Sequence, residues 1–141
     1  MLKRLGIGFM LIIFISMYFQ CSDDENCVEP GNGTDGEPSF ASDIQPIFSA
    51  SCAISGCHDA TTASAELVLT EGQAYAQLVD VLSTQDAGKK LVTPGDAENS
   101  YLVMKLEDRA SVGSAMPLGS TLSDEEIQRI RDWIDAGAED N

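Results

Sequence analysis

The sequence predicts an all-α fold, a small domain of about four short helices joined by long loops. Apolar residues recur at helical spacing in the first part of the domain, and its last part opens with a residue pattern that caps a helix. No stretch alternates between apolar and polar residues convincingly enough to build a sheet. Loops this long in so small a domain usually need something to fold against.

The first predicted helix begins near residue 40. Four apolar residues fall on one helical face there: Phe40, Ile44, Ile47 and Phe48. Ser42 is expected to cap the helix, with Gln45 three residues further on. Pro46 lies early enough in this helix to be tolerated.

Two helices are predicted in the middle of the domain. Residues 73–82 form the first, with an inward face made of Tyr75, Leu78, Val79 and Leu82. After the turn at residues 93–95, Asp96 is expected to cap a second helix that reaches about Leu106. Met104 lies in that helix among apolar neighbours, so we expect it to pack in the core.

The last helix is the clearest element. Ser123 and Glu126 have the spacing of a capping box, and Leu122 and Ile127 have that of a hydrophobic staple. Its apolar face is made of Ile127, Ile130 and Ile134, with Trp133 at the edge, and Gly137 is expected to end it.

The N-terminal segment is typical of export. Residues 1–20 combine a basic start with a short apolar run, as in a signal peptide, and residues 21–39 form an acidic, Gly- and Pro-containing tether to the domain at residues 40–141. Cys21, at the end of the apolar run, resembles the lipid-modified first residue of mature bacterial lipoproteins. We expect a lipid anchor in the outer membrane, on its periplasmic or cell-surface face. The alternative is an uncleaved N-terminal anchor, which also places the domain outside the cytoplasm.

The formal net charge of −15 bears on possible partners. Binding to nucleic acid needs a basic surface, so this class of function is excluded. The charge suits a protein partner with a basic docking patch, although a solvated acidic surface explains it equally well.

A short segment with two cysteines and the chain's single histidine carries the chemistry: Cys52-Ala-Ile-Ser-Gly-Cys57-His58. In the usual C-x-x-C-H motif two thiols attach to haem and the histidine ligates its iron. Here four residues separate the cysteines. Residues five apart on a helix diverge by about 140°, so the intervening residues must bulge, and Gly56 supplies the backbone freedom.

Three alternatives to haem remain open. Cys52 and Cys57 could form a disulfide, as is normal in an exported protein. They could contribute to a zinc site, although Cys27 on the tether is a poor fourth ligand. The pattern could also be a coincidence. The position of His58 directly after Cys57 favours haem, because a disulfide does not require it.

The domain resembles a class of bacterial c-type cytochrome domains that includes the planctomycete-type cytochrome c domains. The matching segments occur in order along the chain: residues 40–48 (FASDIQPIF), 94–96 (PGD), 100–102 (SYL), 116–117 (MP), 122–127 (LSDEEI) and 133–138 (WIDAGA). The resemblance implies a cytochrome c-like fold around one covalent haem c. It also implies Met116 as the second axial ligand, a lining that includes Pro94, Tyr101 and Leu102, and a backbone carbonyl near Pro94 that orients His58. Ordinary turn and core roles explain Pro94, Tyr101 and Leu102 equally well.

Met116 is also favoured by its own surroundings. Only Met104 and Met116 lie beyond the signal segment, and Met116 lies in a loop with little other apolar company. The alternative is a loop methionine that packs into the core. Ligation by His58 and Met116 would leave no open iron position, which favours electron transfer over enzymatic chemistry. The remaining alternatives are a haem-free lipoprotein binding module closed by a disulfide, and a haem sensor or peroxidase with an open iron site.

Overall fold

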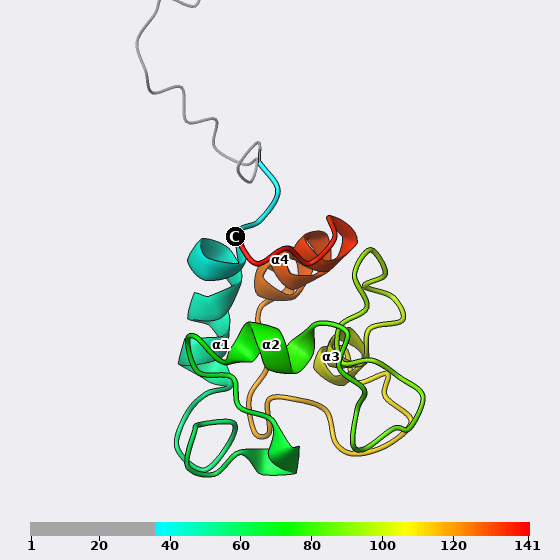
Figure 1. Cartoon of the computed structure of the whole chain (residues 1–141). Helices are drawn as coiled ribbons and strands as arrows, with labels where there is room; N and C mark the ends of the chain where they lie inside the picture. The colour runs from blue at the N-terminus through cyan, green and yellow to red at the C-terminus, as the bar shows by residue number, and fades with distance from the viewer. Residues whose placement is uncertain (1–35) are drawn as a thin grey trace, which may run out of the picture. The chain divides into compact units, whose positions relative to one another are not determined.

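Four short α-helices form the frame of residues 36–141, the part of the chain described by the computed structural model. They are α1 (Gln45–Ser51), α2 (Ala74–Leu78), α3 (Tyr101–Leu106) and α4 (Asp124–Asp135). A π-helical turn, η1 (Phe40–Ile44), leads into α1, and a 3₁₀ turn, η2 (Ser64–Glu66), precedes α2. These residues contain no β-strand, so the predicted all-α class is confirmed for them. Long loops connect the helices (Figure 1).

The first helical segment has the predicted buried face but a different cap. Phe40, Ile44, Ile47 and Phe48 are all buried. The cap is Ser39 and not Ser42, because the Ser39 hydroxyl accepts a hydrogen bond from the Ser42 N–H at 3.3 Å. The wide π turn comes just before Pro46, whose ring would crowd a carbonyl one turn earlier in a regular helix.

The helix predicted for residues 73–82 is shorter than expected. It ends at Leu78, since Val79 is extended and Asp80 has a φ of +61°. The following residues pair instead with a later segment, through isolated bridges from Val79 to Val92 and from Leu82 to Lys90. Leu82, predicted to point inward, is therefore 61% exposed.

The third helix begins later than predicted. Asp96 does not cap it; its carboxylate accepts hydrogen bonds from the backbone and side-chain N–H groups of Asn99, within a turn. The helix starts at Tyr101. Met104 is only half-buried and lies outside the cluster of core residues, so the prediction that it packs in the core is wrong.

The last helix agrees with the prediction. The Ser123 hydroxyl accepts from the Glu126 N–H at 3.2 Å, and the Glu126 carboxylate accepts from the Ser123 N–H at 2.8 Å, which completes the capping box. Ile130, Trp133 and Ile134 are buried, and α4 packs against η1 and α3. Trp133 is 1% exposed, so it is a central core residue and not an edge residue.

The core is built around aromatic rings from η1, α1, α2 and α4. The Phe40 ring lies 5.2 Å from the rings of both Tyr75 and Trp133, measured between centroids, and 6.3 Å from that of Phe48. The two ends of this region meet, because the Asn141 side chain and main chain accept hydrogen bonds from Phe40 and Ala41. None of the helices between residues 36 and 141 has the length and apolar content that a bilayer-spanning segment needs.

Candidate functional site

A cavity of about 470 Å³ lies between the helices and the loops. Its lining comes from the end of α1, residues 52–58, η2, α2, residues 81–85, α3 and residues 116–120. The volume falls in the range of small-molecule and cofactor sites. Six of the seven domain residues predicted for the site line it: Cys52, Cys57, His58, Tyr101, Leu102 and Met116.

The two cysteines flank a loop at the end of α1. Cys52 is the residue that ends the helix, and its N–H still donates to the Phe48 carbonyl at 2.8 Å. The His58 N–H then donates to the Cys52 carbonyl at 3.1 Å, so the chain returns to where it left the helix. Gly56 has a φ of +88° within this loop, a conformation that favours glycine. The predicted bulge is therefore present.

Asp59 holds the outer side of the same loop. Its carboxylate accepts hydrogen bonds from the backbone N–H groups of Thr62, Thr61 and Gly56 at 2.6, 2.7 and 3.1 Å. These bonds, the one from Thr62 above all, lower the pKa of the exposed Asp59 carboxyl. The residue after His58 thus fixes the turn by local bonding.

The His58 ring is oriented by a backbone carbonyl. Its Nδ1 lies 3.1 Å from the carbonyl oxygen of Leu67. A carbonyl only accepts, so in this bond Nδ1 carries the hydrogen, and in the neutral ring this leaves the lone pair on Nε2. An iron-ligating histidine needs this arrangement. The resemblance implied a carbonyl near Pro94 in this role, and the structure places that of Leu67 there instead.

The segment that carries this carbonyl is itself held from three sides. The Gln45 side chain of α1 donates to the Leu69 carbonyl at 3.0 Å. The Gln77 side chain of α2 accepts from the Val68 N–H at 2.7 Å. The Leu69 N–H donates to the His58 carbonyl at 2.8 Å. Two helices therefore fix the residue that orients His58.

The thiols of Cys52 and Cys57 are both free in the structure. Burial, with smaller contributions from the nearby Cys57 and Glu126, raises the pKa of the Cys52 thiol to about 11. A buried, protonated thiol is a poor nucleophile, which argues against Cys52 as a catalytic nucleophile at neutral pH. For the zinc alternative, no group of three or more His, Cys, Asp and Glu side chains placed to hold a metal ion is found between residues 36 and 141.

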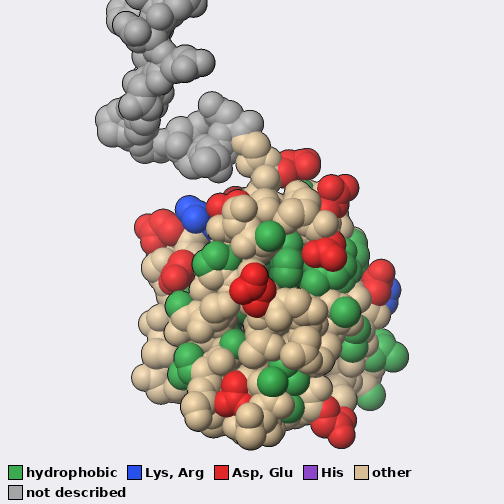
Figure 2. Space-filling view, turned by 60° about the vertical axis from the view of Figure 1, so that its left-hand side comes forward, with side chains coloured by type: hydrophobic (Ala, Val, Ile, Leu, Met, Phe, Trp, Pro, Cys, Tyr) green, Lys and Arg blue, Asp and Glu red, His purple; other side chains and the backbone are tan. Residues whose placement is uncertain are grey.

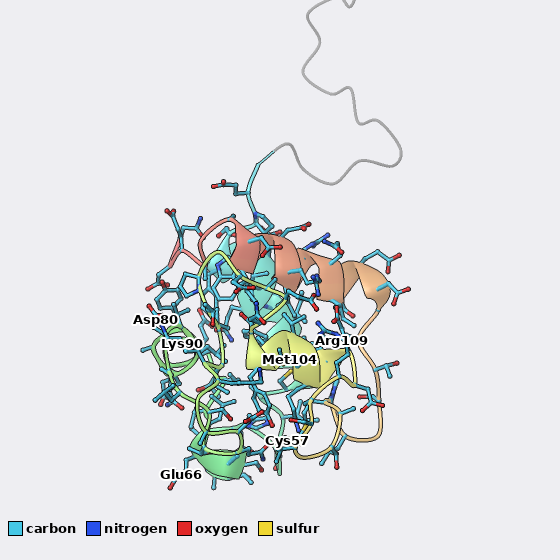
Figure 3. The ribbon with its side chains drawn as sticks, turned by 90° about the vertical axis from the view of Figure 1, so that its right-hand side faces the viewer. Cys57, Glu66, Asp80, Lys90, Met104 and Arg109 are labelled. Atoms are coloured by element: carbon cyan, nitrogen blue, oxygen red, sulfur yellow. The ribbon has the colours of Figure 1, made fainter. Side chains whose placement is uncertain are left out.

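Met116 reaches the cavity from the loop after α3. The Met116 N–H donates to the Lys105 carbonyl near the end of that helix at 2.9 Å, which fixes where the loop passes. Met104 is not part of the lining; it lies on α3 near Arg109 (Figure 3). Of the two methionines in the domain, the one predicted as a ligand is therefore the one at the cavity.

Pro94 is the predicted site residue that the structure places elsewhere. It is not among the residues that line the cavity. Its turn is bonded to the end of α4, since the Gly95 N–H donates to the Ile134 carbonyl at 2.7 Å and the Ala97 N–H donates to Asp135 at 2.8 Å. Pro94 therefore belongs to a structural turn, which was the alternative to a place in the lining of the site.

Tyr101 and Leu102 lie at the start of α3. Tyr101 is buried, and its hydroxyl donates to the Val112 carbonyl at 2.8 Å. Burial raises the pKa of Tyr101, and the charge of Asp86 adds to this effect. The tyrosine thus ties the loop after α3 to the helix beside the cavity.

Sequence reasoning missed the residues that support the site. Gln45 and Gln77 act through hydrogen bonds to residues far along the chain, which no local pattern reveals. Lys105 also lines the cavity and is only 6% exposed. The sequence could have indicated Lys105, because it is the one charged residue in the otherwise apolar segment 101–106.

Comparisons with protein-family models, with characterised proteins and with solved structures find no match to this chain. The resemblance to c-type cytochrome domains therefore stays a prediction.

Proposed function

We propose that this protein is a c-type cytochrome, with a cytochrome c-like domain that carries one covalently attached haem and transfers single electrons. The observation that carries the proposal is one cavity lined by Cys52, Cys57, His58 and Met116. Two thiols, an imidazole and a thioether are the groups that a His/Met-ligated c-type haem requires. These residues come from positions up to 64 apart in the sequence, so local spacing alone does not explain their meeting.

The residues present fit a covalently attached haem. Each thiol would add across one vinyl group, sulfur to one carbon and hydrogen to the other, so attachment consumes no oxidant or reductant. The backbone folds back between Cys52 and Cys57, because the His58 N–H donates to the Cys52 carbonyl at 3.1 Å. Cys52, Cys57 and His58 therefore line one cavity despite the longer spacing of the cysteines. Leucine side chains from η2 onward give the cavity an apolar wall: Leu67, Leu69, Leu78, Leu91, Leu102 and Leu106.

The proposed ligands favour electron transfer over catalysis. His58 would ligate through Nε2 while the Leu67 carbonyl holds Nδ1. Met116 would supply the second ligand of a bound haem, and with both ligands present no iron position would stay open for oxygen or peroxide. Bound haem would supply an iron that accepts and releases one electron.

We also propose that Cys21 carries a lipid anchor in the outer membrane, although it lies outside the described residues. The sequence of residues 1–25 supports this. Cys21→Ala should release the protein from membranes or leave it unprocessed; unchanged fractionation and size would contradict the anchor.

Figure 2 shows Asp and Glu side chains spread over one face of the domain, which suits a redox partner with a basic docking patch. Association with such a partner should weaken as salt is added.

Haem attachment is tested on the full chain, expressed together with haem-maturation machinery. Denatured protein should keep its haem signal on a gel, and its mass should exceed that of the mature chain by one haem. Replacing Cys52 and Cys57 together by Ser should abolish both signals, because no thioether can form. Cys27→Ser, on the tether, is the matched control and should keep them. A mass equal to the chain less two hydrogens would instead support the disulfide-closed module.

A further inference from the structure

Lys105 is a cation buried in the wall of the cavity. It lies in α3, one helical turn after Tyr101, and is 6% exposed. The ammonium of a buried lysine is costly unless an anion or several hydrogen bonds compensate its charge. A buried lysine at a ligand cavity therefore raises the question of what compensates it.

The charge of Asp108 favours the Lys105 ammonium, but no carboxylate of the described residues forms an ion pair with it, so the compensation of Lys105 is only partial. Its Nζ donates to the Val112 carbonyl at 3.5 Å, the outer limit of a hydrogen bond, and lies 5.7 Å from the centroid of the Tyr101 ring. Four of the six Lys and Arg side chains between residues 36 and 141 form ion pairs with carboxylates. Lys105 is not one of them.

The surrounding loop keeps Lys105 beside the cavity. A Cβ added at Gly113 would lie 2.6 Å from the Lys105 Nζ and 3.0 Å from the Gln85 side-chain oxygen, so the loop backbone passes directly over both groups. Gln85, Tyr101 and Lys105 all belong to the cavity lining. They form a polar corner in a wall that is otherwise largely apolar.

We propose that Lys105 pairs with a carboxylate of the cavity's occupant. This inference rests on the proposed function, in which that carboxylate is a haem propionate. The pair would neutralise one negative charge of the bound haem and so favour Fe(II) over Fe(III). Lys105 acts here as a positioning and charge-balancing residue; it does not ligate the metal.

The test is the reduction potential of the haem-loaded full chain. Lys105→Met keeps the length of the side chain and its helix propensity but leaves the propionate unpaired. We expect the Fe(III)/Fe(II) equilibrium to shift about tenfold toward Fe(III), which lowers the potential by 59 mV for one electron. Lys105→Arg should restore most of the potential, because it restores the charge. Lys90→Met removes a cation that pairs with Asp80 at the surface, and its shift should be much smaller.

The outcomes separate this inference from the proposed function. If haem is attached and Lys105→Met has the potential of the unmutated protein, the propionate pair is absent and only this inference is overturned. The same holds if Lys105→Arg matches Lys105→Met, since lost packing would then explain the shift. A chain that attaches no haem overturns the proposed function and this inference with it. Haem staining and the visible spectrum of each variant show which case applies.

Discussion

Met116 and Met104 have different surroundings although they lie only twelve residues apart. Met116 lines the cavity with His58, and a backbone bond to Lys105 fixes its loop. Met104 is half-buried on α3, away from the cavity and from the core cluster. The two side chains thus form a matched pair in which one is the proposed ligand and the other is its control.

We expect Met116→Ala to change the haem spectrum and not merely the stability. The oxidised protein should lose the weak long-wavelength absorption of Fe(III)–methionine ligation, and the reduced protein should bind carbon monoxide. The potential should fall, because a soft sulfur ligand favours Fe(II). Met104→Ala should keep the band and destabilise the fold by only about 1 kcal/mol, since a half-exposed side chain leaves little cavity. If the unmutated protein already binds carbon monoxide readily, the sensor or peroxidase alternative replaces electron transfer.

Site residues could be predicted from the sequence where their side chains carry a distinctive chemical group. Cys52, Cys57, His58 and Met116 carry unusual groups in a recognisable order, and all four line the cavity. Pro94 was placed by resemblance alone, and its turn instead bonds to α4. The carbonyl that orients His58 could not be predicted from the sequence, because every residue has a carbonyl and only the fold selects that of Leu67.

At the scale of the elements, the helices with strong local signals were predicted best. The capping box and apolar face of α4 are properties of neighbouring residues, so they could be identified without the fold. The end of α2 was missed because bridges to Val92 and Lys90 draw residues 79–82 out of the helix. The start of α3 was missed because Asp96 bonds to Asn99 within a turn. Pairing with a later segment thus overrides helical periodicity at the end of α2, and a local side-chain turn does so at the start of α3.

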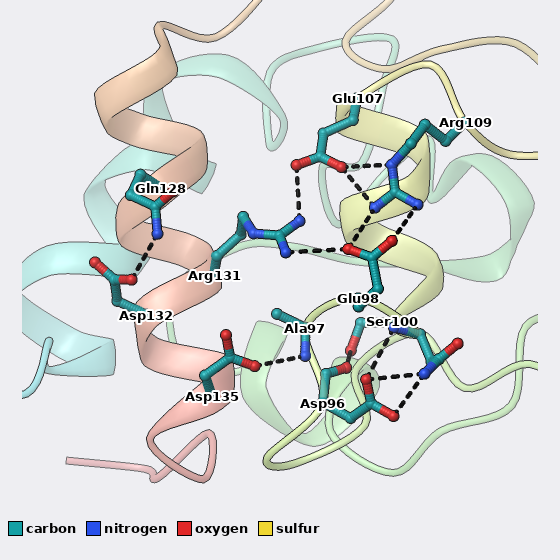
Figure 4. A network of polar contacts seen from close by, with 11 residues as sticks. Asp96, Ala97, Glu98, Ser100, Glu107, Arg109, Gln128, Arg131, Asp132 and Asp135 are labelled. Carbon is teal, nitrogen blue, oxygen red and sulfur yellow. Dashed lines mark hydrogen bonds and ion pairs between the residues drawn. The ribbon is translucent and has the colours of Figure 1, made fainter.

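Four charged side chains link α3 to α4 (Figure 4). Arg131 of α4 contacts Glu107 at 2.8 Å and Glu98 at 3.1 Å, and Arg109 contacts the same two carboxylates at 2.6 and 3.0 Å. Burial alone would raise the pKa of Glu107, but the hydrogen bonds from Arg109 and Arg131 outweigh it and lower the pKa. Glu107 is therefore the carboxyl of this network that links folding to pH.

Glu107→Gln should lower the free energy of unfolding by about 1 kcal/mol at pH 7, because a partly buried network is worth more than a single exposed pair. The folded-state pKa lies below the ordinary value of 4.5, so the contribution is complete above that pH and disappears as the pH falls through the folded-state pKa. Urea unfolding at several pH values should show the two proteins converging as the pH falls below 4.5 and through the folded-state pKa of Glu107. Glu71→Gln, at an exposed position outside the network, is the control. A difference independent of pH would show that Glu107 contributes by packing alone.

At the scale of the whole molecule, residues 36–141 form two main features, an aromatic core and a cavity. The core rings come from η1, α1, α2 and α4, near the point where the described chain begins and ends. Cys57 and Glu66 lie at the opposite end from residue 36 (Figure 3). The cysteine loop thus lies far from residue 36, where the described part of the chain begins.

The two halves should respond differently when haem is absent. The aromatic core is closed by its own contacts: the Tyr75 hydroxyl donates to the Ala138 carbonyl and the Trp133 indole donates to the Glu139 carbonyl, both at 2.9 Å. The cavity walls are mostly loops, and water would wet their leucines if nothing filled the space. Anything that binds only the folded state stabilises it, so we expect an occupant to stabilise the cavity walls more than the aromatic core.

Wild-type chain made without haem-maturation machinery should therefore melt more than about 10 °C below the haem-loaded form. An empty apolar site costs about as much as a deleted large core side chain, roughly 3–5 kcal/mol, and each kcal/mol shifts the melting point of a domain this size by at least about 4 °C. Limited proteolysis of reduced, haem-free protein should cut residues 53–66 and 107–121 first, while Trp133 fluorescence stays close to that of a buried indole. Equal melting points and equal resistance to proteolysis in both forms would show that the cavity walls are stable without haem. The haem-free binding module would then explain the cavity better, because its long loops would need no cofactor to fold against.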